Sequence, residues 1–246
     1  MSHVVGVAID PPHLARTLIE PVPELAAIGI TAFTTTRAAG TFGLAGNDPV
    51  GEVMGRWGTL LGDLAGIARG IAVAPQVHGD TVLAHATGWD GMLRTRPADG
   101  HATIERGVAL AVTIADCVPI FLAHPSGAVA LLHSGWRGTV AHIIDEGIRR
   151  LGVAGVAPDE LHMHLGPAIC GRCYEVDAEV RAKLTGEAAN RPGCVDLRAL
   201  IVNDARAAGV KHISVSHYCT RCDNDRFFSH RAGDSGRQIA VIAAGL

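Results

Sequence analysis

The chain has 246 residues, of which 48% are hydrophobic and 18% are charged, and its formal net charge at pH 7 is −3. This length allows a large hydrophobic core, and we expect a single domain over residues 1–246. The charge balance, with no run of Lys or Arg, argues against a nucleic-acid partner. No apolar run reaches the roughly 18 residues that span a bilayer, and the N-terminus lacks the basic start of a secretory signal, so we expect a cytoplasmic protein without a membrane partner.

The first half of the chain is predicted to contain one helix and several strands. The stretch "GITAFTTTRAAG" (29–40) is typical of a strand that enters a glycine-rich loop. Over residues 50–69, apolar side chains recur at helical spacing, at Val53, Trp57, Leu60, Leu61 and Leu64. Residues 71–84 are predicted to form two strands around a turn. Residues 108–123 and 128–133 are predicted to be buried strands joined by the turn "HPSG".

The second half of the chain alternates helices with strands. The predicted elements are a helix over 138–151, a strand at 160–165, helices near 176–185 and 196–208, a strand at 212–217 and a final strand at 237–245. Short hairpins interrupt the alternation along the chain as a whole. The pattern therefore favours an α/β or α+β domain in which helices flank mixed β-sheets.

Three residues of metal-ligand type each follow an apolar run and precede a turn: His78 in "PQVHGD", Cys117 in "IADCVP" and His133 in "LLHSGW". The separation of Cys117 and His133 fits two adjacent strands joined by a hairpin, which would bring their side chains together. Two His and one Cys are the ligands of an open catalytic zinc site. Such an ion lowers the pKa of its bound water to about 7. A His at a strand end, however, is often only hydrogen-bonded, and a Cys in an apolar strand often only packs.

The same residues allow two other interpretations. Cys117 is a possible thiolate nucleophile with His133 as its base, which would make the protein a metal-free cysteine hydrolase acting on an amide. A non-enzymatic metal-binding module is the third interpretation. Zinc content distinguishes the first two interpretations, and a lack of turnover would favour the third.

Five segments resemble, in the correct order, the signatures of the YfiH family, whose members are also called laccase-domain proteins, polyphenol oxidases or peptidoglycan-editing factors. These segments are "PQVHGDTV", "IADCVPIFLAHP", "HSGWRGT", "LGPAICGRCYEV" and "CTRCDNDRFFSHRAGDSGRQIAVI". The resemblance runs from about Thr34 to the C-terminus. The loop at 40–49 is shorter than is usual in the family, which bears on substrate preference.

The resemblance implies a layered α/β domain that binds one zinc ion through His78, Cys117 and His133, with copper less expected. It also implies that the substrates are purine nucleosides and phosphate. The implied reactions are phosphorolysis of adenosine, inosine, guanosine or methylthioadenosine, and deamination of adenosine. The familiar zinc-deaminase signature, H-x-E followed by P-C-x-x-C, is absent, so deamination would use a different arrangement.

Two carboxylates are candidates for proton transfer. Asp116 directly precedes Cys117, and Asp80 lies two residues after His78. We expect one of them to act with Cys117 and His133 in catalysis, although both residue types also fix turns and cap helices.

Four further side chains are candidates for substrate binding. Arg37, Arg137 and Arg231 carry the guanidinium groups that suit a phosphate, and Gln76 has the amide that suits a purine edge. Each also has a purely structural interpretation: Arg137 stacked on a neighbouring aromatic ring, Arg231 in a surface ion pair, and Gln76 completing a strand end.

Two CxxC motifs, "CGRC" (170–173) and "CTRC" (219–222), leave three possibilities open: a structural zinc site, packing thiols or a redox pair. The "HMH" segment (162–164) places two His on one face of a strand. A trinuclear copper cluster needs several such pairs, and the sequence has only one, which disfavours a true laccase.

Overall fold

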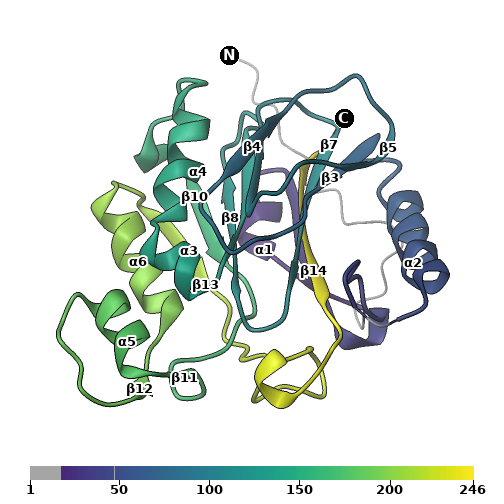
Figure 1. The fold of residues 1–246 in the computed structure, drawn as a ribbon. Helices are drawn as coiled ribbons and strands as arrows, with labels where there is room; N and C mark the ends of the chain where they lie inside the picture. Colours follow the sequence, from purple (N-terminus) through teal and green to yellow (C-terminus); the bar gives the residue numbers. More distant parts are fainter. Residues whose placement is uncertain (1–17, 47) are drawn as a thin grey trace.

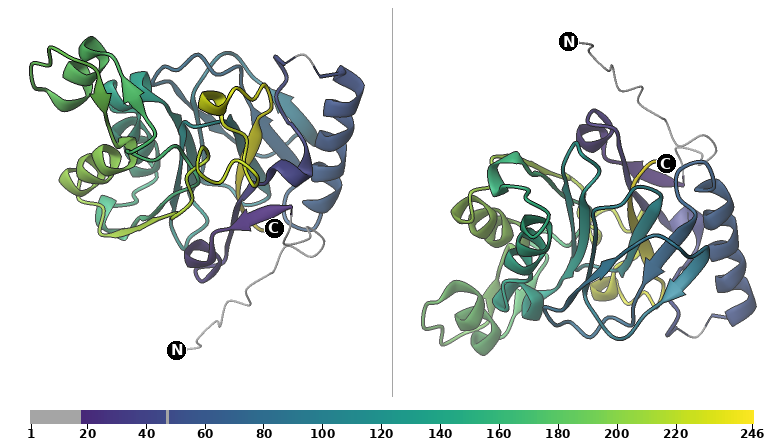
Figure 2. Two further views of the ribbon diagram at one scale, coloured as in Figure 1. Left: turned by 90° about the horizontal axis from the view of Figure 1, so that it is seen from below. Right: turned by 90° about the horizontal axis from the view of Figure 1, so that it is seen from above.

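The computed structural model describes residues 18–46 and 48–246 (Figure 1). The N-terminal stretch that argues against a secretory signal lies outside these residues. Two six-stranded sheets pack face to face, and helices cover both of their outer faces (Figures 1 and 2). This four-layer arrangement confirms the prediction of mixed sheets flanked by helices.

Both large sheets contain parallel and antiparallel neighbours. The first sheet has the order β1 (Ile19–Pro21), β2 (Ile30–Thr35), β14 (Gln238–Ala244), β7 (Val108–Ile114), β3 (Gly70–Val73), β5 (Gly91–Arg94). The second has the order β13 (His212–Val215), β10 (His162–Leu165), β8 (Val118–Ala123), β9 (Val129–Ser134), β6 (Gly100–Thr103), β4 (Val82–His85). A separate two-stranded ladder joins β11 (Glu175–Val176) to β12 (Gly193–Cys194).

The helices are distributed unequally over the two outer faces. They are α1 (Pro23–Ala26), α2 (Val50–Asp63), α3 (Trp136–Val140), α4 (Ile143–Gly152), α5 (Ala178–Thr185) and α6 (Leu197–Ala207). Figure 1 shows α2 on the side of the first sheet, with α3, α4 and α6 on the opposite side. Among the described residues, no helix has the length and apolarity needed to cross a membrane.

The two-residue period of the strands accounts for the layers. In β7, Leu110 and Val112 point between the sheets, whereas Ala109 and Ala111 point towards α2. In β8, Phe121 points between the sheets, and the residues on either side of it pack under the helices. These strands are apolar on both faces because each face is covered.

Two predicted elements are divided in the structure, and two strands predicted around one turn lie in different sheets. The strands predicted within 71–84 are β3 and β4, which belong to different sheets and do not pair. The run 108–123 likewise splits into β7 on the first sheet and β8 on the second. The helix predicted over 138–151 is interrupted at His142, whose φ of 51° is left-handed. A continuous apolar run indicates burial but carries no sign of a change of sheet.

The predicted hairpin at the end of this region is confirmed. β8 and β9 pair antiparallel, with Pro119 opposite His133 and Val118 opposite Ser134. The crossings from β3 to β4 and from β7 to β8 both lead from the first sheet to the second, and His78 and Cys117 within them lie next to Gly135 at this end of the hairpin. His78, Cys117 and His133 therefore meet at this end of the hairpin.

Candidate metal centre

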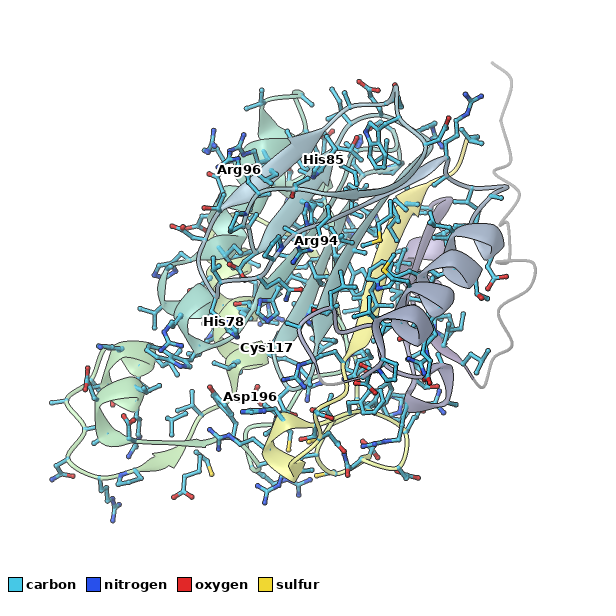
Figure 3. The ribbon with its side chains drawn as sticks, turned by 45° about the vertical axis from the view of Figure 1, so that its right-hand side comes forward. His78, His85, Arg94, Arg96, Cys117 and Asp196 are labelled. Carbon is cyan, nitrogen blue, oxygen red and sulfur yellow. The ribbon has the colours of Figure 1, made fainter. Side chains whose placement is uncertain are left out.

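The structure brings together the three predicted ligands. His78 lies in the crossing between β3 and β4, Cys117 in the crossing between β7 and β8, and His133 in β9. One ligand atom from each residue lies within 4.8 Å of the other two, and the two imidazole ring centroids are 4.9 Å apart. Figure 3 shows the exposed His78 next to Cys117. His133 is 3% exposed, so the ligands form a ring that opens to solvent on the side of His78.

A buried carboxylate that the sequence analysis missed positions both histidines. Asp99 is fully buried, and its Oδ1 lies 2.9 Å from His133 Nδ1. With its Nδ1–H donated to this carboxylate, the ring turns Nε2 towards Cys117. The backbone N–H groups of Val77, His78 and Gly79 also donate to Asp99. In sequence, Asp99 precedes a glycine and has the signature of an ordinary turn.

One residue of the ligand ring and one residue next to it have strained backbones. His78 has a φ of 62° and Asp116 a φ of 82°, a region that non-glycine residues rarely enter. The three backbone N–H groups that donate to Asp99 hold the turn at His78. Thr220 Oγ1 and the Arg231 N–H donate to the two oxygens of Asp116 and hold the turn at that residue. The buried Asp116 thus positions Cys117, and its oxygens are already engaged.

The ring favours a deprotonated thiol. Burial raises the pKa of Cys117, but the charges and hydrogen bonds of His133 and His78 outweigh it and lower the pKa to about 6. Burial lowers the pKa of His133, but the thiolate and the Asp99 carboxylate outweigh it and raise the pKa to about 9. A thiolate is the form of Cys that binds metals.

The space around the ligands also fits a bound ion. Gly135 lies beside Cys117, across the end of the hairpin, and a Cβ atom there would lie 2.9 Å from Cys117 Sγ and 3.4 Å from His78 Cδ2. Only a residue without a side chain leaves the sulfur free to turn towards the two imidazoles. Two nitrogens and one sulfur suit zinc or copper better than a hard cation.

Gly135→Ala is expected to lower the zinc affinity by about 10-fold or more, because the new methyl group displaces the Cys117 sulfur. The matched control is Gly62→Ala on the exposed face of α2, where an added Cβ meets no atom within 4 Å. Zinc competition with a chromogenic chelator measures both variants. An unchanged zinc affinity in Gly135→Ala would show that the space beside the Cys117 sulfur is not needed for metal binding.

The ligand ring opens into a cavity of about 510 Å³. Its lining includes loop residues 43–46. Polar groups on the wall come from Gln76, Arg94, Thr113, His230 and Arg237. Figure 3 shows Arg94 on the same side of the molecule as His78. This volume lies in the range of small-molecule sites.

The predicted substrate-binding residues occupy different places. Gln76 lines the cavity and bonds to the backbone and hydroxyl of Thr113, and its second Nε2 hydrogen has no partner among the described residues. Arg37 donates to Asp234 at 2.6 Å and to the loop around it. It is absent from the described residues that line the cavity.

Arg137 and Arg231 are also absent from the described residues that line the cavity. The Arg137 guanidinium stacks 4.4 Å from the Trp136 ring centroid, and that of Arg231 lies 4.8 Å from the Tyr174 ring centroid. Burial raises the pKa of Tyr174 to about 12, with a further contribution from the charge of Cys117 and opposing ones from the two arginines. Both arginines are exposed. The exposed Asp80 follows His78 closely on the outside of the ring.

Comparisons with known proteins identify the family. A family profile described as "Multi-copper polyphenol oxidoreductase laccase" matches residues 36–245. The chain belongs to this family. It is 32% identical over 235 residues to a purine nucleoside phosphorylase of Corynebacterium glutamicum, covering 85% of this chain and 92% of that protein. A purine nucleoside phosphorylase of Streptomyces griseus is 35% identical over 175 residues, covering 68% and 71%.

Solved structures share the fold. YlmD from Geobacillus stearothermophilus is 31% identical with a TM-score of 0.80, covering 90% of this chain and 93% of that one. A hypothetical YfiH protein of Bacillus licheniformis has a TM-score of 0.83 at 24% identity, covering 94% and 98%. The resemblance to the YfiH family that the sequence motifs indicate is thus confirmed.

Proposed function

We propose that this protein is a metal-dependent purine nucleoside phosphorylase that binds zinc through His78, Cys117 and His133. The observation that carries the proposal is the convergence of these three ligands, oriented by Asp99, at the mouth of a cavity of nucleoside size. The substrate class comes from the relatives, which are named purine nucleoside phosphorylases.

A bound zinc ion would supply Lewis-acid chemistry at the mouth of the cavity. The family name points to copper instead. His162 and His164, the pair most like those of copper oxidases, are engaged elsewhere: His162 stacks on His212, and His164 Nδ1 lies 2.8 Å from Ser214 Oγ. Because His162 and His164 are engaged away from the three-residue site, that site would hold a single ion rather than a copper cluster, and we propose that the ion is zinc.

The chain's own side chains would bind the two substrates and move the proton. Gln76 would donate its second Nε2 hydrogen to a purine in the cavity. Arg137 and Arg231, which lie beside Trp136 and Tyr174 rather than in the cavity lining, would attract the phosphate. A phosphate oxygen bonds to the sugar carbon as the bond to the purine nitrogen breaks, and the leaving purine takes up a proton. That proton comes from the hydrogen phosphate, and the exposed Asp80 is our candidate to relay it to the purine, whereas Asp116 positions Cys117.

The test measures zinc and phosphorolysis together. We expect one equivalent of zinc at this site and phosphate-dependent release of purine from inosine or adenosine. Both should be lost in His78→Ala, Cys117→Ala and His133→Ala, and retained in Cys194→Ala, which changes an exposed cysteine elsewhere. Ammonia release from adenosine tests whether deamination also occurs. Unaltered phosphorolysis in Cys117→Ala would overturn the proposal.

One observation favours a second candidate, a metal-free cysteine hydrolase. Cys117, His133 and Asp99 stand in the order of nucleophile, base and orienting carboxylate. Removing metal with a chelator distinguishes the two candidates. A zinc phosphorylase loses its turnover on chelation, whereas a hydrolase keeps its turnover.

The metal-free protein has a predictable pH response. Because the pKa of Cys117 is lowered to about 6, its thiolate forms as the pH rises through that value, well below the value of about 8.5 for an ordinary cysteine. Alkylation by iodoacetamide, followed by peptide mass spectrometry, should therefore give a midpoint near pH 6. In His133→Ala the midpoint should rise. A wild-type midpoint near that of an ordinary cysteine would contradict the thiolate–imidazolium pair.

A further inference from the structure

The two CxxC motifs lie on adjacent loops far from one another in sequence. Cys170 and Cys173 follow β10, and Cys219 and Cys222 follow β13. β10 and β13 are parallel neighbours, so the two loops leave the second sheet at the same edge. A parallel bridge between Ala168 and Cys219 extends this pairing into the loops.

The four sulfurs form a compact cluster, in which all four Sγ atoms lie within 4.8 Å of one another. A tetrahedral ion with metal–sulfur bonds of about 2.3 Å holds its sulfurs roughly 3.8 Å apart. Cys173 Sγ and Cys222 Sγ are 3.4 Å apart. We propose that these four cysteines bind one structural zinc ion as a tetrathiolate, independently of the site at His78, Cys117 and His133.

The surroundings of the cluster suit negatively charged sulfurs. The backbone N–H groups of Cys170 and Cys222 donate to Cys219 Sγ at 3.2 and 3.4 Å. Hydrogen bonds of this kind stabilise thiolate ligands of a metal. Each motif also has an arginine at its third position, and the guanidinium of Arg221 donates to the Cys173 carbonyl at 3.2 Å. Zinc with four thiolates carries a net negative charge, which these arginines offset.

The other interpretations of the cysteines fit the geometry less well. Cys219 is buried in the core and Cys173 packs against the core's edge, but Cys222 is exposed, so packing alone does not explain why all four thiols gather in one place. A redox pair needs two cysteines, whereas here the two motifs contribute four to one cluster. Tetrahedral sulfur sites are typical of zinc.

The ion would anchor both loops against the turn that precedes Cys117. Next to Cys170, the Ile169 N–H donates to the Asp116 carbonyl at 3.0 Å. Next to Cys219, the Thr220 hydroxyl donates to the Asp116 carboxylate at 2.6 Å. The role of this site is therefore to stabilise the loops, and its loss is expected to lower the melting temperature.

Elemental analysis of protein purified under reducing conditions tests the proposal. Wild type should hold two zinc ions per chain, and Cys173→Ser/Cys222→Ser should hold one. The matched control is Cys194→Ser, whose sulfur lies near the Arg172 carbonyl but outside the cluster, and it should hold two. Cys117→Ala should also retain one ion, the tetrathiolate zinc. If His78, Cys117 and His133 bind no zinc, the wild type would still hold the one ion at the four cysteines.

Cobalt binding provides a measurement that does not depend on catalysis. Metal-stripped Cys117→Ala should bind Co²⁺ with strong thiolate charge-transfer absorption, and the further change Cys222→Ser, at an exposed position, should remove that absorption. Circular dichroism shows whether each variant is folded. The proposal is overturned if Cys117→Ala holds neither zinc nor cobalt, or if intact mass shows a Cys173–Cys222 disulfide in the freshly purified protein.

Discussion

Replacing Asp99 with Asn is expected to lower the affinity for zinc by about 10- to 100-fold. The carboxylate accepts one bond from His133 Nδ1 and three from the backbone N–H groups of residues 77–79. An amide offers one oxygen in place of two, and its NH₂ group would face donors. Both histidine ligands therefore lose their orientation at once. Zinc competition with a chelator measures the change.

The control for this variant is Asp196→Asn. Asp196 makes the same kind of bond, from its carboxylate to the Ala199 N–H at the start of α6, but it is exposed and lies outside the ligand ring. Its amide variant should bind zinc as wild type does. Equal affinity in Asp99→Asn and wild type would show that Asp99 does not position the ligands.

Trp57→Ala is expected to reduce the free energy of unfolding by about 3–5 kcal/mol. The Trp57 side chain is 1% exposed and packs edge-on against Phe42, with ring centroids 5.5 Å apart. Its indole N–H also donates to the Phe42 carbonyl at 3.2 Å. Truncation leaves a cavity between α2 and the first sheet and an unsatisfied carbonyl. Urea unfolding measures the loss, which is a large share of the roughly 5–15 kcal/mol typical of a folded domain.

Met54→Ala provides the comparison on the same helix. Met54 is 42% exposed, so its truncation should change the unfolding free energy by no more than about 0.5 kcal/mol. Trp57 also lines the cavity together with loop residues 43–46. If Trp57→Ala lowers the free energy of unfolding no more than Met54→Ala does, the Trp57 indole does not hold loop residues 43–46 against α2.

Much of the fold was predictable because it depends on local pattern. The helical spacing of Val53, Trp57 and Leu60 correctly predicted the buried face of α2. The continuous apolar runs correctly predicted β9 and β14, and they predicted the strand character of 108–123 but not its division into β7 and β8. The β8–β9 hairpin followed from a four-residue turn between two such runs. That hairpin alone was enough to predict that Cys117 and His133 meet.

The sequence by itself therefore determined most of the elements and the class of fold, and it predicted the three residues that the structure brings together. Only the tertiary structure decided which strands share a sheet, that Asp99 orients both histidines, and that the cysteines at 170–173 and 219–222 form one cluster. It also separated Gln76, which lines the cavity, from Arg37, which holds a loop. The physical reason is distance along the chain. Hydrophobic periodicity and turn preferences depend on residues a few positions apart, whereas these contacts join distant segments that meet only when the two sheets pack together.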